Sequence, residues 1–549
     1  MSSPKYLFII GGVISGVGKG VASSSIGRIL KNKGYSVTAI KIDPYINIDA
    51  GTMNPTEHGE VFVLPDGDET DQDMGNYERF LNTDLTSQNY MTTGRVYQSV
   101  IEKERSLYYK GKCVEVVPHI PLEVIQRIEN AQKKSQAEIV IIEIGGTVGE
   151  YQNMLFLEAA RMLKIKHPKD VFFGMVSYLP FPAKVGEMKT KPTQTAVRTL
   201  NASGIQPDII IARSALALDY KRKEKISVFC NISPERIIAA PDVESIYDVP
   251  TNFEKEGLST ILMSLLGLPK KKAQNKEALE WSNFLKKSHT TKKTVSIAVI
   301  GKYFETGDYV FSDSYVSVIE ALKYSAYGEN CKPVLTWISA TDFENGKKPL
   351  SALKKFDGVL VPGGFGARGV EETIKVIEYV RKNKIPYFGI CYGMQLAIIE
   401  IARHVAHLKD AHTEEVHPKT AYPVIHIMDS QKEHISQKNY GGNMRLGSYQ
   451  AEITPGTIAY EAYQKTSIIE RHRHRYEVNT AYADKLEKAG VVFSGKSKDG
   501  TLMEIMELSK KIHPFFVGVQ FHPEFLARPL NPHKLFTAFI KACVRIHNK

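Results

Sequence analysis

The stretch Ile385-Pro-Tyr-Phe-Gly-Ile-Cys-Tyr-Gly393 joins a short apolar run directly to a helix-like run, Met394–Arg403. Glycine two residues to either side of Cys391 permits a sharp strand-to-helix turn that exposes the central side chain. A thiol held there lies at a helix N-terminus, whose partial positive charge favours the thiolate. The pattern therefore predicts an α/β unit with a reactive Cys391, against the alternative that the cysteine is a buried small apolar residue.

Two further features are suited to acyl transfer at this thiol. His522 and Glu524 lie two residues apart, directly after the strand-like run Phe515–Phe521. This spacing suits a histidine base whose ring is oriented by an acid. The glycine turn Pro362–Gly369 could present backbone N–H groups as an oxyanion hole, together with the N–H of the residue after the thiol. The predicted triad is Cys391, His522 and Glu524, and the predicted oxyanion donor after the thiol is Tyr392.

Length, composition and charge limit the class of protein. A chain of 549 residues exceeds one core, so at least two domains are expected. Hydrophobic content of 43% is ordinary for a globular protein, and no run reaches the ~18 apolar residues of a membrane helix. The net charge of +11 suggests an acidic partner, for which polyphosphate substrates fit better than nucleic acid, because no RNA-binding or zinc pattern occurs. Five scattered cysteines favour a reducing cytoplasm over a disulfide framework.

The first half opens on a strand, a glycine loop and a helix. Tyr6–Ile10 is typical of a buried parallel strand, and Val21–Lys31 reads as a helix. Between them, Gly11-Gly-Val-Ile-Ser-Gly-Val-Gly-Lys-Gly20 offers backbone N–H groups and a lysine, which suit a phosphate cradle. The loop departs from the regular P-loop, because Gly12 is one residue too far from Gly18 and Gly20 replaces the hydroxyl residue.

A second lysine and two acids also follow strand-like runs or loops. Tyr35–Ile40 leads to Lys41, and Glu138–Ile142 leads to Glu143, at the edge where open α/β sheets bind ligands. Asp73 ends an acidic run. Two carboxylates near a phosphate cradle suit Mg²⁺, although any one acid here would otherwise be a solvated turn residue.

The segment Lys189-Thr-Lys-Pro-Thr-Gln194 is predicted to be extended or turning, because proline disfavours helix at Lys191. In extended chain, Lys189 and Lys191 would point toward one anion. Further strands are expected over 209–213 and 237–240, each ending in polar residues.

A change to lysine, asparagine and glutamine marks residues 269–293 as a linker, with a short helix over 278–285. A fresh buried strand, Val295–Ile300, starts a new α/β unit. We therefore expect two doubly wound α/β domains, over 1–268 and 294–549, the first P-loop-like.

Beyond these separate features, the chain resembles the CTP synthase family over nearly its whole length. The resemblance implies an N-terminal amidoligase and a C-terminal class I glutamine amidotransferase. ATP would phosphorylate O4 of UTP, and ammonia from glutamine would displace the phosphate to give CTP. The motifs, in family order, are G-G-V-I-S-G-V-G-K-G, K-I-D-P-Y-I-N-I-D-A-G-T-M, H-G-E-V-F-V, E-I-G-G-T-V-G, K-T-K-P-T-Q, P-G-G-F-G-A-R-G, G-I-C-Y-G-M-Q, R-H-R-H-R-Y-E-V-N and F-H-P-E-F.

The resemblance also implies roles for individual residues. Mg²⁺ would be held with ATP by Asp73 and Glu143. Contacts to ATP would come from Ser15, Gly16, Val17, Gly18, Lys19, Gly20, Lys41, Asp73, Arg213 and Asp242. Contacts to UTP or CTP would come from Ser15, Glu150, Gln152, Lys189, Thr190, Lys191, Gln194 and Lys225. Glutamine would be positioned by Gln395, Glu415 and Arg475, and Gly364 and Tyr392 would supply the oxyanion N–H groups.

The family further implies regulation and assembly. GTP would activate through the region Arg368–Glu371, and CTP would inhibit by feedback. The chain would form a homotetramer whose pyrimidine site borrows Glu158 and Arg161 from neighbours, and His58 and Val61 would lie near an ammonia passage.

Three departures from the family pattern stand out. Glu150 and Gln152 replace the usual aspartate and glutamate, which leaves nucleotide affinity and CTP feedback open. The segment 301–314 is longer than expected, and Tyr392 replaces leucine, with little harm expected because the oxyanion donor is backbone.

Two other functions fit parts of the pattern. Another glutamine-dependent ATP amidoligase would share both domains but act on a substrate without a pyrimidine. A partition-type ATPase scaffold would use the positive charge to bind DNA, yet it would have no need of an acyl-transfer site at Cys391.

Overall fold

The computed structural model describes residues 3–182, 184, 186–271, 276–301, 305–306, 309–310, 312–344, 348–428, 431 and 441–547. Contacts within the chain divide it into two compact units. The first unit comprises Met1–Asp49 and Asp73–Leu285, and the second comprises Ala50–Gln72 and Lys286–Lys549. Parts of the expected linker (272–275) and of the long segment 301–314 (302–304, 307–308 and 311) lie outside the described residues.

The first unit is built on a parallel seven-stranded sheet in the order β5-β2-β6-β1-β7-β8-β9. The continuous apolar runs predicted to be strands form its centre, because a sheet covered on both faces buries every side chain of a strand. Its strands are β1 (Lys5–Gly12), β2 (Val37–Asp43), β5 (Tyr90–Thr92), β6 (Ile139–Ile144), β7 (Val171–Tyr178), β8 (Ile209–Ser214) and β9 (Ile237–Pro241).

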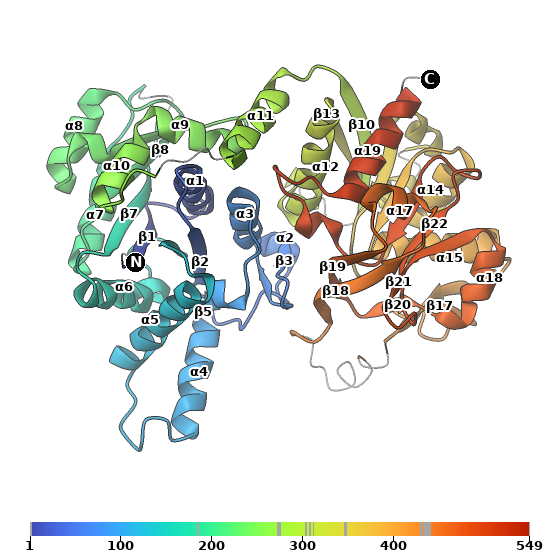
Figure 1. Ribbon diagram of the computed structural model, residues 1–549, viewed down its shortest axis with the longest axis horizontal. Coiled ribbons are helices and arrows are strands. Elements are labelled where there is room, and N and C mark those ends of the chain that lie inside the picture. The colour runs from blue at the N-terminus through green and yellow to red at the C-terminus, as the bar shows by residue number, and fades with distance from the viewer. Residues whose placement is uncertain are drawn as a thin grey trace. The chain divides into compact units, whose positions relative to one another are not determined.

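Helices cover both faces of this sheet. One face shares a core with α4 to α8, and α1 and α9 pack together against the other. Figure 1 shows α4 and α5 side by side, extending past the β5 edge. The helices are α1 (Lys19–Asn32), α3 (Gln72–Leu81), α4 (Thr93–Arg105), α5 (Val116–Ser135), α6 (Met154–Lys166), α7 (Lys191–Ala202), α8 (Tyr220–Cys230), α9 (Val249–Lys255), α10 (Leu258–Leu265) and α11 (Lys276–Thr290).

Helix α11 is longer than the short helix expected over 278–285. Its Trp281 and Phe284 are buried, and the Trp281 ring lies 5.3 Å from that of Phe80 and 5.8 Å from that of Tyr247. None of the described helices is both long and apolar enough to cross a bilayer.

The second unit contains a mixed nine-stranded sheet in the order β13-β10-β14-β15-β23-β22-β21-β18-β19. The strands from β13 to β23 pair in parallel, and those from β23 to β19 pair antiparallel. Its strands are β10 (Thr294–Gly301), β13 (Lys332–Ser339), β14 (Gly358–Val361), β15 (Tyr387–Ile390), β18 (Arg445–Ile453), β19 (Ser467–His474), β21 (Val491–Ser497), β22 (Met503–Leu508) and β23 (Phe516–Val519).

Smaller elements complete the second unit, and the expected α/β fold class is confirmed for the chain. The small strands are β3 (Val61–Val63), β4 (Glu69–Asp71), β11 (Glu305–Thr306), β12 (Tyr309–Val310), β16 (Ala411–Thr413), β17 (Tyr422–Ile427) and β20 (Tyr476–Val478). The helices are α2 (Pro55–His58), α12 (Val316–Gly328), α13 (Thr341–Glu344), α14 (Val370–Lys382), α15 (Tyr392–His404), α17 (Ile458–Tyr463), α18 (Ala483–Lys488) and α19 (Lys534–His547).

Candidate active sites

The sharp turn predicted at Cys391 is present between β15 and α15. Cys391 has the backbone angles φ 48° and ψ −97°, a conformation that costs a non-glycine residue on the order of 1–3 kcal/mol. Both flanking glycines are required for space. A Cβ at Gly393 would lie 2.3 Å from the carbonyl oxygen of Val361, and one at Gly389 would lie 2.7 Å from the hydroxyl of Tyr387. The surrounding backbone therefore holds Cys391 in a strained conformation, and such strain is common at functional residues.

His522 and Glu524 follow β23, the strand adjacent to β15. Nδ1 of His522 lies 2.8 Å from Oε1 of Glu524. Burial lowers the pKa of His522, but Glu524 and then Cys391 outweigh burial and raise it to about 10. His522 is therefore an imidazolium at neutral pH.

Cys391, His522 and Glu524 line one cavity of about 470 Å³ within the second unit. The predicted oxyanion residue Gly364 lies in its wall. Arg475 and Val61, predicted to contact glutamine and ammonia, also lie in the wall, whereas His58 is exposed on α2. Further wall residues come from the segment that follows β2 in sequence: Gly51, Thr52, Met53, Pro55 and Glu60.

The other residues predicted to serve glutamine flank this cavity. Nε2 of Gln395 donates to the carbonyl oxygen of Tyr476 at 2.8 Å. Oε1 of Glu415 accepts from the backbone N–H of Gly366 at 2.7 Å, and the hydroxyl of Tyr392 donates to the carbonyl oxygen of Gly366 at 2.9 Å. Glu415 and Tyr392 thus fix the glycine turn.

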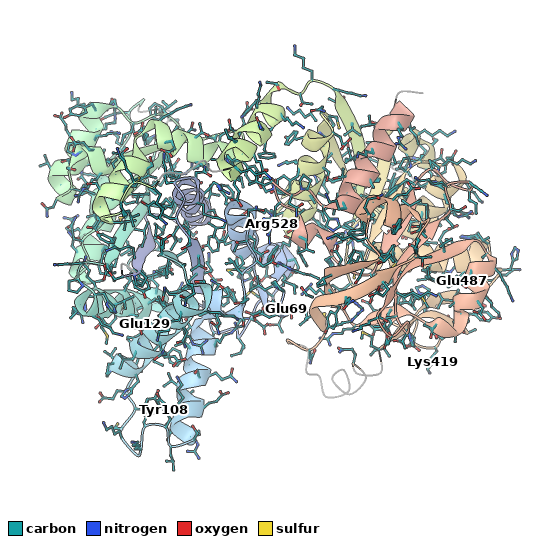
Figure 2. The ribbon with its side chains drawn as sticks, viewed as in Figure 1. Glu69, Tyr108, Glu129, Lys419, Glu487 and Arg528 are labelled. Atoms are coloured by element: carbon teal, nitrogen blue, oxygen red, sulfur yellow. The ribbon has the colours of Figure 1, made fainter. Side chains whose placement is uncertain are left out.

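Two buried carboxylates that the sequence did not single out anchor the segment 50–72 in the second unit. Glu69, labelled in Figure 2, accepts from Nε of Arg473 at 2.8 Å. Glu60 accepts from the backbone N–H of Ser317 at 3.1 Å. Their partners lie 404 and 257 residues away in the chain, so no local pattern indicates either contact.

A second candidate site lies at the glycine loop of the first unit. Nζ of Lys19 donates to the carbonyl oxygen of Gly146 at 2.9 Å, and burial lowers the pKa of Lys19. A Cβ at Gly20 would lie only 2.2 Å from Oδ1 of Asp73. The departure from the regular P-loop at position 20 therefore has a steric reason, because Asp73 takes the space that a hydroxyl side chain would fill.

Lys41 is buried among three carboxylates. Its Nζ hydrogen-bonds Asp73, lies 2.9 Å from Oε1 of Glu143 and 3.7 Å from Oδ1 of Asp43. Burial lowers the pKa of Lys41, but Asp73, Glu143 and Asp43 outweigh it and raise the pKa well above its ordinary value. Burial raises the pKa of Glu143 and of Asp43 above the ordinary carboxyl value. Asp43 was not predicted, although it ends the same strand as Lys41.

Arg213 and Asp242, predicted to lie on the adenine side of ATP, are paired. Nη2 of Arg213 lies 3.0 Å from Oδ1 of Asp242. Both line a cavity of about 210 Å³ that also includes Gly18 of the glycine loop and the buried Phe253. A mostly apolar pocket beside a phosphate loop suits a purine ring.

Ser15 and Glu150, predicted to contact the pyrimidine nucleotide, line an open basin of about 720 Å³ with Thr147 and Thr199. Gln152 is exposed beside it, and its Nε2 donates to Oε2 of Glu150 at 2.9 Å.

The extended segment predicted around Lys191 is wrong at that residue. Helix α7 begins at Lys191, with Pro192 in the first turn, where the missing proline N–H costs no helical hydrogen bond. Thr190, just before it, accepts from Nε2 of Gln194 at 3.1 Å.

One of the predicted triphosphate lysines pairs with an exposed carboxylate. Nζ of Lys189 lies 2.9 Å from Oε2 of Glu187, and its hydrogen bond lowers the pKa of Glu187. Lys225 lies on α8, in the first turns of that helix.

Residues predicted for regulation and for subunit assembly make ion pairs within the chain. Glu371 pairs with Arg403 at 2.7 Å and with His412 at 3.2 Å. Glu158 and Arg161 pair with each other at 2.6 Å on α6.

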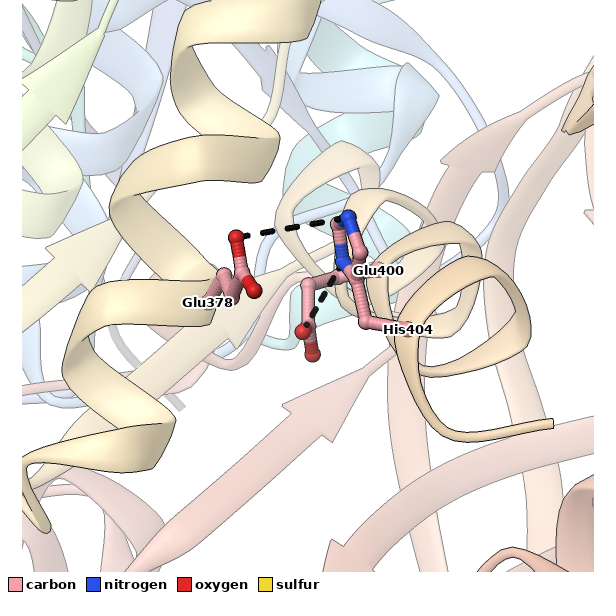
Figure 3. A group of neighbouring side chains, drawn as sticks. All are labelled: Glu378, Glu400 and His404. Carbon is pink, nitrogen blue, oxygen red and sulfur yellow. Dashed lines mark hydrogen bonds and ion pairs between the residues drawn. The ribbon is translucent and has the colours of Figure 1, made fainter. Parts of the chain in front are cut away.

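Glu378, Glu400 and His404 form a cluster whose ligand atoms lie within 4.8 Å of one another (Figure 3). Both oxygens of the fully buried Glu400 accept from Arg381, at 2.7 and 2.8 Å. The charge of Glu400 is already balanced, so this cluster is an ion-pair network that joins α14 to α15.

Two protein families and several known proteins are similar to the chain in sequence. Residues 5–268 match the CTP synthase N-terminus, and residues 310–542 match class-I glutamine amidotransferases. The CTP synthase of Sulfurisphaera tokodaii is 47% identical over 544 residues, covering 99% of this chain and 100% of the relative. That of Pyrococcus furiosus is 48% identical over 541 residues, covering 98% and 97%.

Among solved structures, the glutaminase domain of Trypanosoma brucei CTPS with bound acivicin is 34% identical. The match covers 46% of this chain and 94% of that one, with a TM-score of 0.42. Since both matched families and the full-length relatives together span nearly all residues, the chain belongs to the CTP synthase family of glutamine-dependent ligases.

Proposed function

We propose that the chain converts UTP to CTP with ammonia that it releases from glutamine at Cys391, His522 and Glu524. The observation that carries this proposal is the cavity these three residues share, in which the imidazolium of His522 neighbours the thiol. The carboxylate of Glu524 orients the imidazole ring at 2.8 Å.

In glutamine hydrolysis, the sulfur of Cys391 attacks the side-chain carbonyl carbon of glutamine. Backbone N–H groups of Gly364 and Tyr392 receive the oxyanion. The C–N bond breaks as His522 gives its proton to the nitrogen, which leaves as ammonia and a thioester remains. His522 then takes a proton from water, and the resulting hydroxide cleaves the thioester to glutamate and thiolate.

In the synthetase reaction, O4 of UTP attacks the γ-phosphorus of ATP as the N3 proton leaves, and ADP departs. Ammonia then attacks C4, and the phosphate leaves with a proton to give CTP. Phosphorylation is needed because a carbonyl oxygen is a poor leaving group. Lys19 and Lys41 would stabilise the charge on the transferring phosphoryl group. The adenine would lie in the cavity lined by Arg213 and Asp242.

Asp73 and Glu143 would hold Mg²⁺ with ATP, and Asp43 adds a third carboxylate beside them. Carboxylate oxygens are the ligands that Mg²⁺ prefers, and three carboxyl groups meet at Lys41. When bound, Mg²⁺ would supply charge neutralisation at the phosphates.

The pyrimidine nucleotide would lie over Ser15 and Glu150, with Lys189, Thr190, Lys191, Gln194 and Lys225 toward its triphosphate. CTP would compete there. Gln152 lacks the charge usual at its position, so CTP feedback is the property most open to change. GTP activation would act through Arg368–Glu371, where Glu371 already links α14 to Arg403 and His412.

A homotetramer is supported by apolar residues on α4, α5 and the loop that joins them. Leu107 and Tyr108 are 71% and 66% exposed, and Tyr108 is labelled in Figure 2. Ile101, Val116, Val117 and Leu122 are also exposed. Large apolar side chains exposed on adjoining helices are typical of a protein interface.

One assay tests the proposal. Purified chain is given UTP, ATP and Mg²⁺ with either glutamine or ammonium, and CTP is measured by chromatography and mass spectrometry. Cys391→Ala should abolish CTP formation from glutamine and preserve it from ammonium, whereas Lys19→Ala should stop both. Failure to aminate UTP from either nitrogen source, with glutamine still hydrolysed, would instead favour another amidoligase.

A further inference from the structure

A buried amide contacts the thiol of Cys391. Gln520 lies directly after β23 and is 1% exposed. Its Nε2 lies 3.5 Å from Sγ of Cys391, and its Oε1 accepts from Nε2 of Gln395 at 3.2 Å. The backbone N–H of Gln520 also donates to the carbonyl oxygen of Glu504 at 2.9 Å, which ties the residue to β22.

The hydrogen bonds fix which end of the Gln520 amide faces the sulfur. The carbonyl oxygen of Tyr476 can only accept, so the group of Gln395 that lies 2.8 Å from it must be the amide nitrogen. That same nitrogen reaches Gln520, which must therefore present its oxygen to Gln395. The nitrogen of Gln520 is left facing Cys391, and an amide nitrogen can only donate.

We propose that Gln520 is a positioning residue for glutamine hydrolysis, whose amide N–H holds the Cys391 sulfur as a thiolate and directs it into the cavity. Gln395 locks that amide in place. This inference rests on the proposed role of Cys391 as the nucleophile.

A neighbouring carbonyl group disfavours negative charge on the sulfur, and the N–H of Gln520 opposes that effect. The carbonyl oxygen of Arg473 lies 3.9 Å from Sγ, and its partial negative charge opposes a thiolate. Hydrogen bonds to a charged atom are roughly twice as strong as neutral ones, so the Gln520 N–H favours the thiolate over the thiol. Both N–H groups of Gln395 are used by Tyr476 and Gln520, so Gln395 supports the thiol through Gln520.

The test measures the rate at which iodoacetamide alkylates Cys391 in the full-length chain, across pH, by peptide mass spectrometry. Gln520→Leu removes the donor, and Gln520→Glu keeps the size and the acceptor for Gln395 but turns a carboxylate toward the sulfur. Near neutral pH, alkylation should fall about tenfold in Gln520→Leu, the effect of losing about 1.4 kcal/mol, and further in Gln520→Glu. The rates should converge at strongly alkaline pH, where every thiol is ionised.

The other cysteines are internal controls in the same samples. Cys113 is exposed and should react equally in all variants, whereas Cys331 and Cys543 are buried in the second unit and should stay unreactive if it is folded. A purely structural role predicts the opposite order, because the isosteric change Gln520→Glu would then be tolerated better than Gln520→Leu.

Equal alkylation of Cys391 in wild type and both variants overturns the inference, as does the reverse order. If Cys331 becomes reactive in Gln520→Glu, the second unit of that variant is unfolded, and Gln520→Leu alone tests the inference. An unchanged pH profile of Cys391 alkylation in Gln520→Leu then overturns it. The turnover number for glutamine should fall with alkylation, while CTP formation from ammonium stays at the wild-type level. If Cys391 of the wild-type chain is alkylated as expected but the chain never releases glutamate from glutamine, the proposed function is refuted and this inference is not.

Discussion

Replacing Glu524 by glutamine removes the negative charge that holds a proton on His522, and glutamine hydrolysis should slow by roughly 10²- to 10⁴-fold. Oε1 of Glu524 lies 2.8 Å from Nδ1 of His522, and both side chains are buried. An amide of the same shape keeps the packing but supplies no charge, and it can hold the ring in the wrong tautomer.

The influence of Glu524 on its partner is reflected in the pKa of His522. That pKa is about 10 against an ordinary 6.5, a difference of roughly 5 kcal/mol in favour of the imidazolium. Burial opposes this, so Glu524 and Cys391 together contribute more than the net value. If Glu524 contributes half of the net value, its loss weakens proton binding by His522 by about 2.5 kcal/mol, or roughly 70-fold in proton affinity. The loss of rate follows from misdirected acid–base catalysis, which contributes about 10²- to 10⁴-fold when the ring is correctly held.

The assay is glutamate release as a function of pH, with CTP formation from ammonium measured alongside. In the wild type, activity should persist until pH approaches the His522 pKa of about 10, and in Glu524→Gln the alkaline decline should begin at lower pH. Glu470→Gln is a matched control, because Glu470 and His533 form an equally buried pair at 2.9 Å in the same unit. The reasoning is refuted if Glu524→Gln hydrolyses glutamine at the wild-type rate, or if Glu470→Gln slows it equally.

Three other outcomes are expected. The raised pKa of His522 contributes stability that is fully present below about pH 6.5 and is lost as pH rises through about 10. The melting temperatures of wild type and Glu524→Gln should therefore converge across that pH window. Lys41→Met should abolish CTP formation from either nitrogen source and lower the free energy of unfolding by roughly 3–5 kcal/mol, measured with urea; an unchanged urea midpoint would contradict the buried cluster. Gly20→Ala should displace Asp73 and stop synthesis from ammonium, while Gly328→Ala, whose Cβ meets nothing within 4 Å, should not.

Much of the fold could be predicted because its signals are local. Runs such as Tyr6–Ile10 and Val295–Ile300 are apolar at every position or nearly so, which indicates strands buried on both faces of a parallel sheet. The turn at Cys391 could also be predicted, since two glycines at fixed spacing have a steric meaning that the structure bears out at Gly389 and Gly393.

The residues that the sequence did not reveal are those whose partners lie far away in the chain. The segment Ala50–Gln72 belongs to the second unit although its neighbours on both sides belong to the first. Nothing local distinguishes Glu69 from a solvated acid before Arg473 is placed beside it. Gln520 is different, because it precedes His522 by two residues and strand alternation alone would put both side chains on one side.

Both proposed sites keep charge buried before any substrate arrives, at Lys41 in the first unit and at His522 in the second. Removing one member of a buried pair leaves its partner uncompensated, so loss of activity must be separated from loss of fold. The chain carries reporters for this purpose. Burial raises the pKa of Cys230, in the first unit, and of Cys331, in the second, to about 11. Neither thiol should react with iodoacetamide at neutral pH while its unit is folded. A variant that loses CTP formation with both thiols unreactive has lost chemistry, whereas alkylation at Cys230 or Cys331 assigns the defect to the unfolding of that unit.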